Sequence, residues 1–352
     1  MPLSAVDCVG PAFEHMTNQL FRPFRLGQWT RLAFVGLLAG ELTSFSCNYH
    51  AQRANAPGHG GVWPGPHIDP AVFIPIALFA GVLVSILSLV ILYINSRMRF
   101  VLFDSVVERK CSVRRMWAAR GSPAFQYFVW QLIYFLLVFV GACLIIGVPA
   151  LFVFLSGWVT SWREHLGPLV LIGAIVFFVF LGCLLFSAVV YVFTKDFVVP
   201  QMALEKISPL EGWARLLRML GPEKGRYIGY ALLKAVLTMA AAIATGIAAV
   251  IIFLLLLIPL GGVGVIWLGI GRAAGLSWNV FTITAAIVAG CVLLFILFYA
   301  VSLVAAPVIV FFPAYSIYFF AARYPPLAKL VYPTSPTPVQ PPLVQPPPEP
   351  IG

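Results

Sequence analysis

Charged residues are scarce in this chain. Asp, Glu, Lys and Arg make up 10% of its 352 residues, whereas hydrophobic residues make up 61% and the mean hydropathy is +0.97. Soluble domains carry about 25% charged residues, so this composition excludes a soluble globular protein. Apolar runs of about 20 residues or more cross a bilayer as helices. The sequence therefore predicts an all-α protein, a polytopic helical membrane bundle.

Closely spaced cysteines and catalytic signatures are also missing. The six cysteines form no CxxC pair and three of them fall inside apolar runs, so their spacing predicts no disulfide framework. No Ser/His/Asp set and no GxSxG, HExxH or Walker sequence occurs at a meaningful spacing. We expect no cofactor and no enzymatic activity, and we keep an intramembrane enzyme only as a third class of function.

The start of the chain has no apolar h-region, so we expect no signal peptide. Residues 1–28 instead carry Phe13, Met16 and Leu20 at helical spacing, with an aromatic and arginine-rich stretch after them. This pattern is typical of an amphipathic helix at a membrane surface. We predict a cytoplasmic interfacial segment over residues 1–28.

Six apolar runs are predicted to cross the membrane within a transmembrane domain of residues 29–324. They are Thr30–Cys47, Ala71–Asn95, Phe125–Leu155, Pro168–Phe193, Ala231–Ile258 and a run that starts near Trp278. Pro149, Pro259 and Pro307, with the glycines at 261–264, are expected to kink or break these helices.

The basic residues lie almost entirely on one side of these spans. Nineteen of the 22 Lys and Arg residues fall in the N-terminal segment, the second and fourth loops and the C-terminal segment. The positive-inside rule places these segments, and both termini, in the cytoplasm of a multi-pass cell-membrane protein. Because the bases stand beside apolar spans, the net charge of +10 indicates anionic lipid rather than nucleic acid as the partner.

Two short basic segments read as amphipathic helices on the cytoplasmic side. In the second, Ser208 and Glu211 form a capping box, Pro209 suits the first helical position and Gly221 suits the stop. The first covers about residues 113–120. We expect both to contact anionic lipid headgroups or a protein partner, which includes a second copy of the chain. The candidate residues are Arg114, Arg115, Trp117, Arg120, Trp213, Arg215 and Arg218.

The two basic segments also resemble each other. At an offset of 97 residues, Phe-Val at 100–101 matches Phe-Val at 197–198, and the Glu-Arg at 108–109 matches Glu-Lys at 205–206. A parallel internal repeat would explain this likeness, and chance is the alternative.

Glu41 is the one acid well inside a predicted span. A carboxylate there suggests a proton relay or an ion site. Because Glu41 falls toward the outer end of a short span, we favour an interfacial or hydrogen-bonded glutamate. Lys195, Asp196 and Lys234 sit at span ends and are expected to reach the interface by snorkelling.

The outer loop after the first span carries His50, His59 and His67. Histidines are competent zinc ligands, but these spacings fit no compact site, so a flexible loop is favoured over metal binding. The tail, residues 325–352, has eleven prolines and is predicted to be disordered and cytoplasmic. Its PxxP spacings could dock in an aromatic groove, and a solvated tail is favoured.

Three stretches resemble a known family: RPFRLGQW (Arg22–Trp29), DFVVPQMALE (Asp196–Glu205) and ARYPPLAKLVYP (Ala322–Pro333). They are similar to an uncharacterised family of bacterial and archaeal six-span membrane proteins. That family is distantly similar to the membrane domain of some glycerophosphoryl diester phosphodiesterases. The resemblance implies a helical membrane fold in a prokaryote and carries over no catalytic residue.

These observations lead to one expected function and one alternative. We expect a non-enzymatic membrane protein that engages anionic lipid headgroups or a partner protein through its cytoplasmic helices. The alternative is a transporter or channel for a small solute, with Glu41 and the Pro/Gly-broken helices along its pathway.

Overall fold

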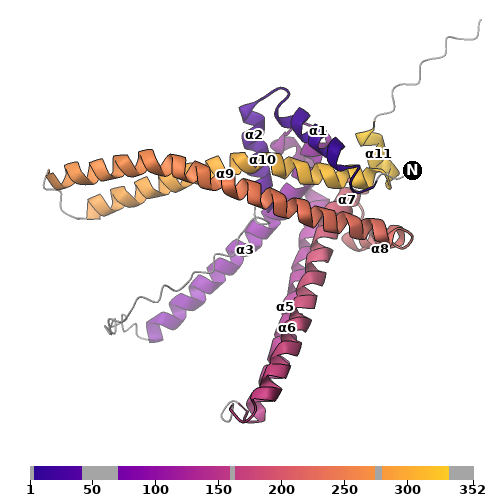
Figure 1. Ribbon diagram of the computed structural model, residues 1–352, viewed down its shortest axis with the longest axis horizontal. Coiled ribbons are helices and arrows are strands. Elements are labelled where there is room, and N and C mark those ends of the chain that lie inside the picture. The colour runs from indigo at the N-terminus through magenta and orange to yellow at the C-terminus, as the bar shows by residue number, and fades with distance from the viewer. Residues whose placement is uncertain (1–3, 42–69, 159–162, 274–279, 333–352) are drawn as a thin grey trace, which may run out of the picture.

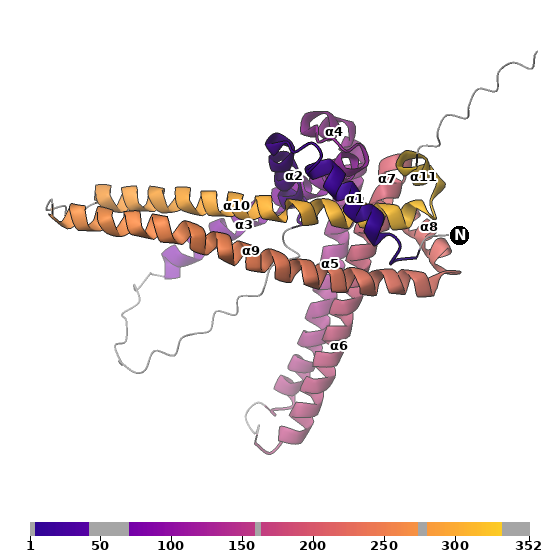
Figure 2. The ribbon, with the colours of Figure 1, turned by 45° about the horizontal axis from the view of Figure 1, so that its top comes forward.

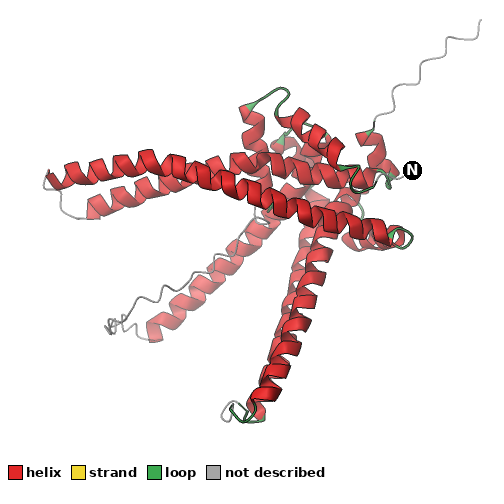
Figure 3. Cartoon of the chain, in the orientation of Figure 1, coloured by secondary structure: helices red, strands yellow, loops and turns green. Residues whose placement is uncertain are grey.

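The computed structural model describes residues 4–41, 70–158, 163–273 and 280–332, and in these ranges the chain is helical with no strand (Figure 3). The helices are α1 (Val9–Leu20), α2 (Leu26–Leu38), α3 (Pro70–Val107), α4 (Val113–Ala119), α5 (Gly121–Leu155), α6 (Leu166–Phe193), the π-helical turn η2 (Thr194–Val198), α7 (Val199–Glu205), α8 (Pro209–Leu220), α9 (Lys224–Ala273), α10 (Val280–Ala321) and α11 (Pro325–Val331).

Five helical segments are long and apolar enough to cross a membrane: Ile74–Val107, Gly121–Leu155, Leu166–Glu205, Lys224–Leu256 and Ile287–Ala321. The predicted first span at residues 30–47 is not among them. Residues 30–38 of it belong to α2, whose 13 residues extend about 20 Å, less than the ~30 Å of hydrocarbon. Residues 42–47 lie outside the described part.

The long helices run through the positions where the sequence predicted breaks. α5 contains Pro149, and α10 contains Pro307 and Pro313. α9 is continuous from Lys224 to Ala273, across Pro259 and the glycines that follow it. Membrane helices tolerate proline because local adjustments and neighbouring side chains satisfy the freed carbonyl groups. The described helices are therefore not broken at these positions, and kinks at the prolines stay a prediction.

The long helices converge at one end and diverge at the other (Figures 1 and 2). We call the three diverging parts legs: α3 alone, the α5–α6 pair and the α9–α10 pair. We call the convergent end the junction, which also contains α1, α2, α4, η2, α7, α8 and α11. The buried residues gather at the junction. In the most apolar stretch of each long helix, by contrast, at most 6% of the residues are buried.

The N-terminal helices belong to the junction. α1 packs on α10 with Met16 and Leu20 buried, whereas Phe13 is exposed. Part of its apolar face therefore covers protein, and the interfacial position of this segment stays a prediction. α2 packs on α3 and α10. At Gly36 an added Cβ would lie 2.3 Å from the Ile309 side chain, so only glycine permits this close approach of α2 to α10.

The helices of the two basic segments differ in how closely their ends match the sequence prediction. α8 has the predicted bounds, and the Ser208 Oγ accepts from the Glu211 N–H at 3.3 Å. Gly221 follows in right-handed rather than left-handed conformation. In the first segment, α4 is followed directly by α5, which begins at Gly121.

The tail begins later than predicted. Residues 325–331 form α11, with Leu327 fully buried, and two prolines fit its first turn because the N–H groups there need no helical partner. Residues 333–352 lie outside the described part.

Candidate functional site

The site is built around the π-helical turn η2, between α6 and α7. π-turns are rare and occur often at functional sites. Lys195 of this turn pairs with Glu41 beyond the end of α2, and Asp196 pairs with Lys234 of α9. Two adjacent side chains thus connect the α5–α6 leg to two different neighbours.

Asp196 is held on the α9 side. It accepts from the Lys234 ammonium and from the Tyr230 hydroxyl at 2.9 Å, and Lys234 also lies 3.5 Å from that hydroxyl. Asp196, Tyr230 and Lys234 are all buried. A buried carboxylate is tolerated only with such partners.

Backbone geometry at the end of α2 places Glu41 opposite Lys195. Gly40 has φ +77°, a left-handed conformation that ends the helix. The Glu41 N–H then donates to the Gly36 carbonyl at 2.9 Å. Because Gly36 is packed tightly on α10, the Glu41 carboxyl group is fixed at the junction and 6% exposed. Its Oε1 has no hydrogen-bond partner among the described residues.

Arg99 of α3 completes the charged cluster. Its guanidinium donates to the hydroxyls of Tyr127 at 2.6 Å and Tyr191 at 2.8 Å and to the Ala39 carbonyl at 3.1 Å. These three acceptors are uncharged in their ordinary state, so they solvate Arg99 without neutralising it.

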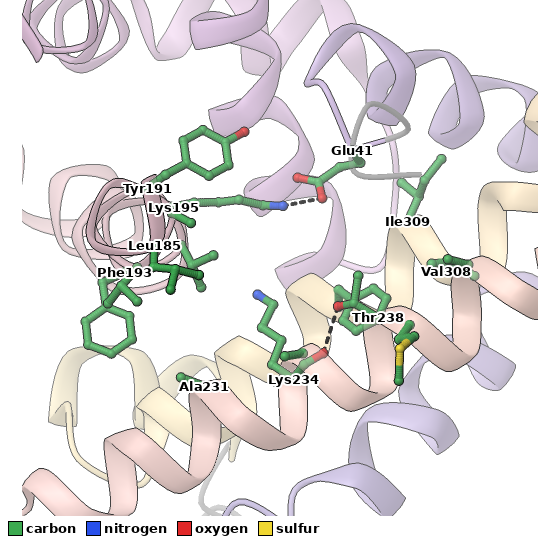
Figure 4. Close-up of a pocket in the computed structure, with 17 residues that line it drawn as sticks. Glu41, Leu185, Tyr191, Phe193, Lys195, Ala231, Lys234, Thr238, Val308 and Ile309 are labelled. Atoms are coloured by element: carbon green, nitrogen blue, oxygen red, sulfur yellow. Dashed lines mark hydrogen bonds and ion pairs between the residues drawn. The ribbon is translucent and has the colours of Figure 1, made fainter. Parts of the chain in front are cut away.

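A cavity of about 590 Å³ adjoins this cluster (Figure 4). Its polar lining consists of Glu41, Tyr191, Lys195, Lys234 and Thr238, and the remaining lining is apolar. The nearby buried charges are three cations and two carboxylates, which leaves one positive charge unbalanced. In a region of low dielectric an unbalanced charge is costly to bury and interacts strongly with an opposite charge.

The apolar wall of the cavity lies between two legs. Leu185 and Val189 of α6 line it together with Met239 of α9 and Phe312 of α10. The site therefore combines a polar cluster with a net positive charge and an apolar lining contributed by α6, α9 and α10.

Four predicted residues lie here, but not as the sequence suggested. Glu41 was expected near the outer end of a span and is found at the junction with Lys195. Lys195, Asp196 and Lys234 were expected to snorkel and instead form ion pairs inside the protein. Arg99 was not among the predicted residues. The offset of 97 residues could have pointed to it, because this offset aligns Arg99 with Asp196, a charged residue that had already been singled out.

Three of the five predicted lipid-facing arginines already have carboxylate partners. Arg120 is bidentate to Asp104, with both N–O distances 2.8 Å. Arg115 pairs with Glu108, and Arg215 pairs with Glu205 and Glu211. Of the five arginines, these three therefore form ion pairs within the protein, and contact of the two helices with lipid headgroups or a partner stays a prediction.

The other candidates on these helices divide between packing and exposure. The guanidinium carbon of Arg97 lies 4.5 Å from the ring centroid of Trp117. The Trp213 indole N–H donates to the Thr194 hydroxyl at 3.2 Å. Both tryptophans thus fix the helices to the junction. Arg114 and Arg218 are exposed, with no ion pair among the described residues.

The predicted metal candidates His50, His59 and His67 lie outside the described residues. Within the described ranges, no group of three or more His, Cys, Asp or Glu residues could hold a metal ion.

The chain belongs to a family described as "Family of unknown function (DUF7544)", whose sequence model matches residues 3–330. Comparison with curated proteins and with solved structures gives no match.

Proposed function

We propose that this protein is a non-enzymatic integral membrane protein that binds an anionic lipid with the headgroup in the junction cavity. The observation that carries the proposal is the unbalanced positive charge of Arg99, Lys195 and Lys234 over Glu41 and Asp196 beside an apolar cavity. A headgroup with one negative charge would neutralise this cluster.

The shape of the cavity supports an amphiphile over a fully polar solute. Pockets for small ligands commonly enclose about 300–1,000 Å³, and the volume here falls in that range. The lysine ammonium groups suit a phosphate, and the apolar wall between α6 and α9 suits an acyl chain. The proposal places the junction at the cytoplasmic leaflet, because most basic residues lie at that end.

The exposed arginines of α4 and α8 provide a second, weaker contact in this proposal. Arg114 and Arg218 would meet headgroups at the leaflet surface, each contributing about 1 kcal/mol before screening. A partner protein or a second copy at the same surface is the alternative occupant.

Native mass spectrometry of protein released gently from membranes tests the proposal. The variant pair Lys195→Gln with Lys234→Gln should lose retained anionic lipid about tenfold or more, since two cations are removed from the headgroup. The matched pair Arg114→Gln with Arg218→Gln also removes two charges. These charges are exposed, screened and outside the cavity lining, so this variant should keep the lipid held in the cavity. Lys195→Arg with Lys234→Arg controls for the loss of charge as opposed to a disturbed fold. Equal retention by wild type and the lysine-to-glutamine pair would refute the cavity as the site.

A transporter remains the second candidate function, favoured by the buried ion pair of Glu41 with Lys195 beside the cavity. The continuous helices do not supply the interrupted segments on which that alternative was based. Solute flux in proteoliposomes that Glu41→Gln abolishes would favour it over simple lipid binding.

A further inference from the structure

If the proposed function holds, the hydrogen-bond donors and acceptors that have no partner at the cavity indicate which headgroup the ligand carries. A lysine ammonium has three N–H donors. Lys195 uses one on Glu41, and Lys234 contacts Asp196 and Tyr230. Among the described residues this leaves two donors on Lys195 and one on Lys234, all charged.

The cavity also holds one open acceptor. Glu41 lines it, is 6% exposed, and has a carboxylate Oε1 without a hydrogen-bond partner among the described residues. An ionised carboxylate can only accept, and leaving a buried acceptor without a donor is unfavourable. The side chains that line the cavity therefore leave three charged donors and one buried charged acceptor without partners among the described residues.

We infer that the ligand is a lipid phosphodiester whose headgroup also carries a free hydroxyl, as a glycerol or polyol headgroup does. The phosphate oxygens would accept from Lys195 and Lys234, and the headgroup hydroxyl would donate to Glu41 Oε1. Such a headgroup carries one negative charge, which balances the cluster.

Two other headgroup classes satisfy only part of the site. A simple alkyl phosphodiester neutralises the charge but leaves Glu41 Oε1 without a donor. An ethanolamine headgroup supplies an ammonium donor for Glu41 but has no net charge, so the positive charge of the cluster stays unbalanced.

The test is a competition between lipids matched in charge and chains. Purified protein is mixed with equal amounts of phosphatidylglycerol and phosphatidylethanol, two phosphodiesters that differ in the headgroup hydroxyls, and bound lipid is read by native mass spectrometry. Wild type should prefer phosphatidylglycerol about tenfold, the size expected of one hydrogen bond to a charged group. Phosphatidylethanolamine in the same mixture should bind less than phosphatidylglycerol.

Substitution of Glu41 should remove the preference without removing the binding. In Glu41→Ala the ratio of the two phosphodiesters should fall to within about twofold of one. Glu41→Gln covers the case in which alanine disturbs the fold. Its carbonyl must face the Lys195 ammonium, so its amide N–H₂ replaces Oε1 and donates instead of accepting. Glu211→Ala, which removes a carboxylate on the exposed side of α8, should keep the wild-type ratio.

The outcomes separate this inference from the function on which it rests. Lysine-dependent binding with a wild-type ratio near one, or with a preference for phosphatidylethanolamine, would overturn the inference and leave the proposed function standing. Binding that does not depend on Lys195 and Lys234 would overturn both.

Discussion

The junction and the legs are stabilised in different ways. In the legs, about two-thirds of the surface of residues such as Phe186 and Leu294 is not covered by protein, so these side chains face lipid. At the junction, Phe197 is fully buried, with the ring centroids of Tyr230 and Phe320 within 5.3 Å of its own.

This contrast follows from the solvent. In a bilayer, lipid tails solvate apolar side chains as well as other side chains do, so hydrophobic burial does not drive leg helices together. Packing of rings and pairing of charges distinguish one arrangement from another, and both are concentrated at the junction. We therefore expect the junction to determine the fold and the legs to tolerate change.

The largest expected effect comes from removing one junction ring. Phe197→Ala should lower the free energy of unfolding by about 3–5 kcal/mol, because it opens a cavity in packed surroundings. Phe186→Ala, the same change in a leg, should lie within about 0.5 kcal/mol of wild type. Denaturant titration in mixed micelles measures both. Equal losses would contradict the division into junction and legs.

The second comparison concerns polar pairs. Asp196→Ala leaves Lys234 buried without its carboxylate and should cost about 3–5 kcal/mol. In the α5–α6 leg, Tyr134 donates to the Ser187 hydroxyl at 2.9 Å. Because hydrogen bonds between membrane helices contribute about 0.6 kcal/mol on average, Ser187→Ala should cost no more than about 1 kcal/mol. The same titrations apply, and restoration of stability by Lys234→Met in the Asp196→Ala background would confirm that the uncompensated charge is the cause.

The smallest effect is a pH dependence confined to the junction. His15 of α1 donates from Nε2 to the Val106 carbonyl at 3.0 Å, so its Nδ1 accepts from the Tyr318 hydroxyl at 3.2 Å. Burial, and then the positive charge of Arg109, lower the pKa of His15, while hydrogen bonds to Val106 and Gln19 oppose this.

The unfolded chain therefore binds a proton at His15 before the folded one does. Stability should be fully present above the unfolded-state pKa of about 6.5 and should decline as the pH falls below it. His15→Gln should reduce the slope of unfolding free energy against pH in that window, whereas Thr17→Ala on the same helix should not. An unchanged slope in His15→Gln would show that the ring is protonated equally in both states.

Local pattern was sufficient for much of the fold. Run length and composition predicted a helical membrane protein, and five of the six predicted spans coincide with long apolar helices. The Ser208–Glu211 capping box, with Pro209, gave the bounds of α8 correctly. These features depend on neighbouring residues and on the length of an apolar run relative to the bilayer. Both can be read from a single sequence.

Only the tertiary structure decided where the charges went. Glu41 and Lys195 are 154 residues apart in sequence, and nothing near either residue distinguishes a snorkelling side chain from an ion-paired one. The close approach at Gly36, the left-handed turn at Gly40 and the π-turn at η2 bring them together. Pairing of distant charges depends on how whole helices pack, and that packing is a property of the folded chain rather than of any local stretch.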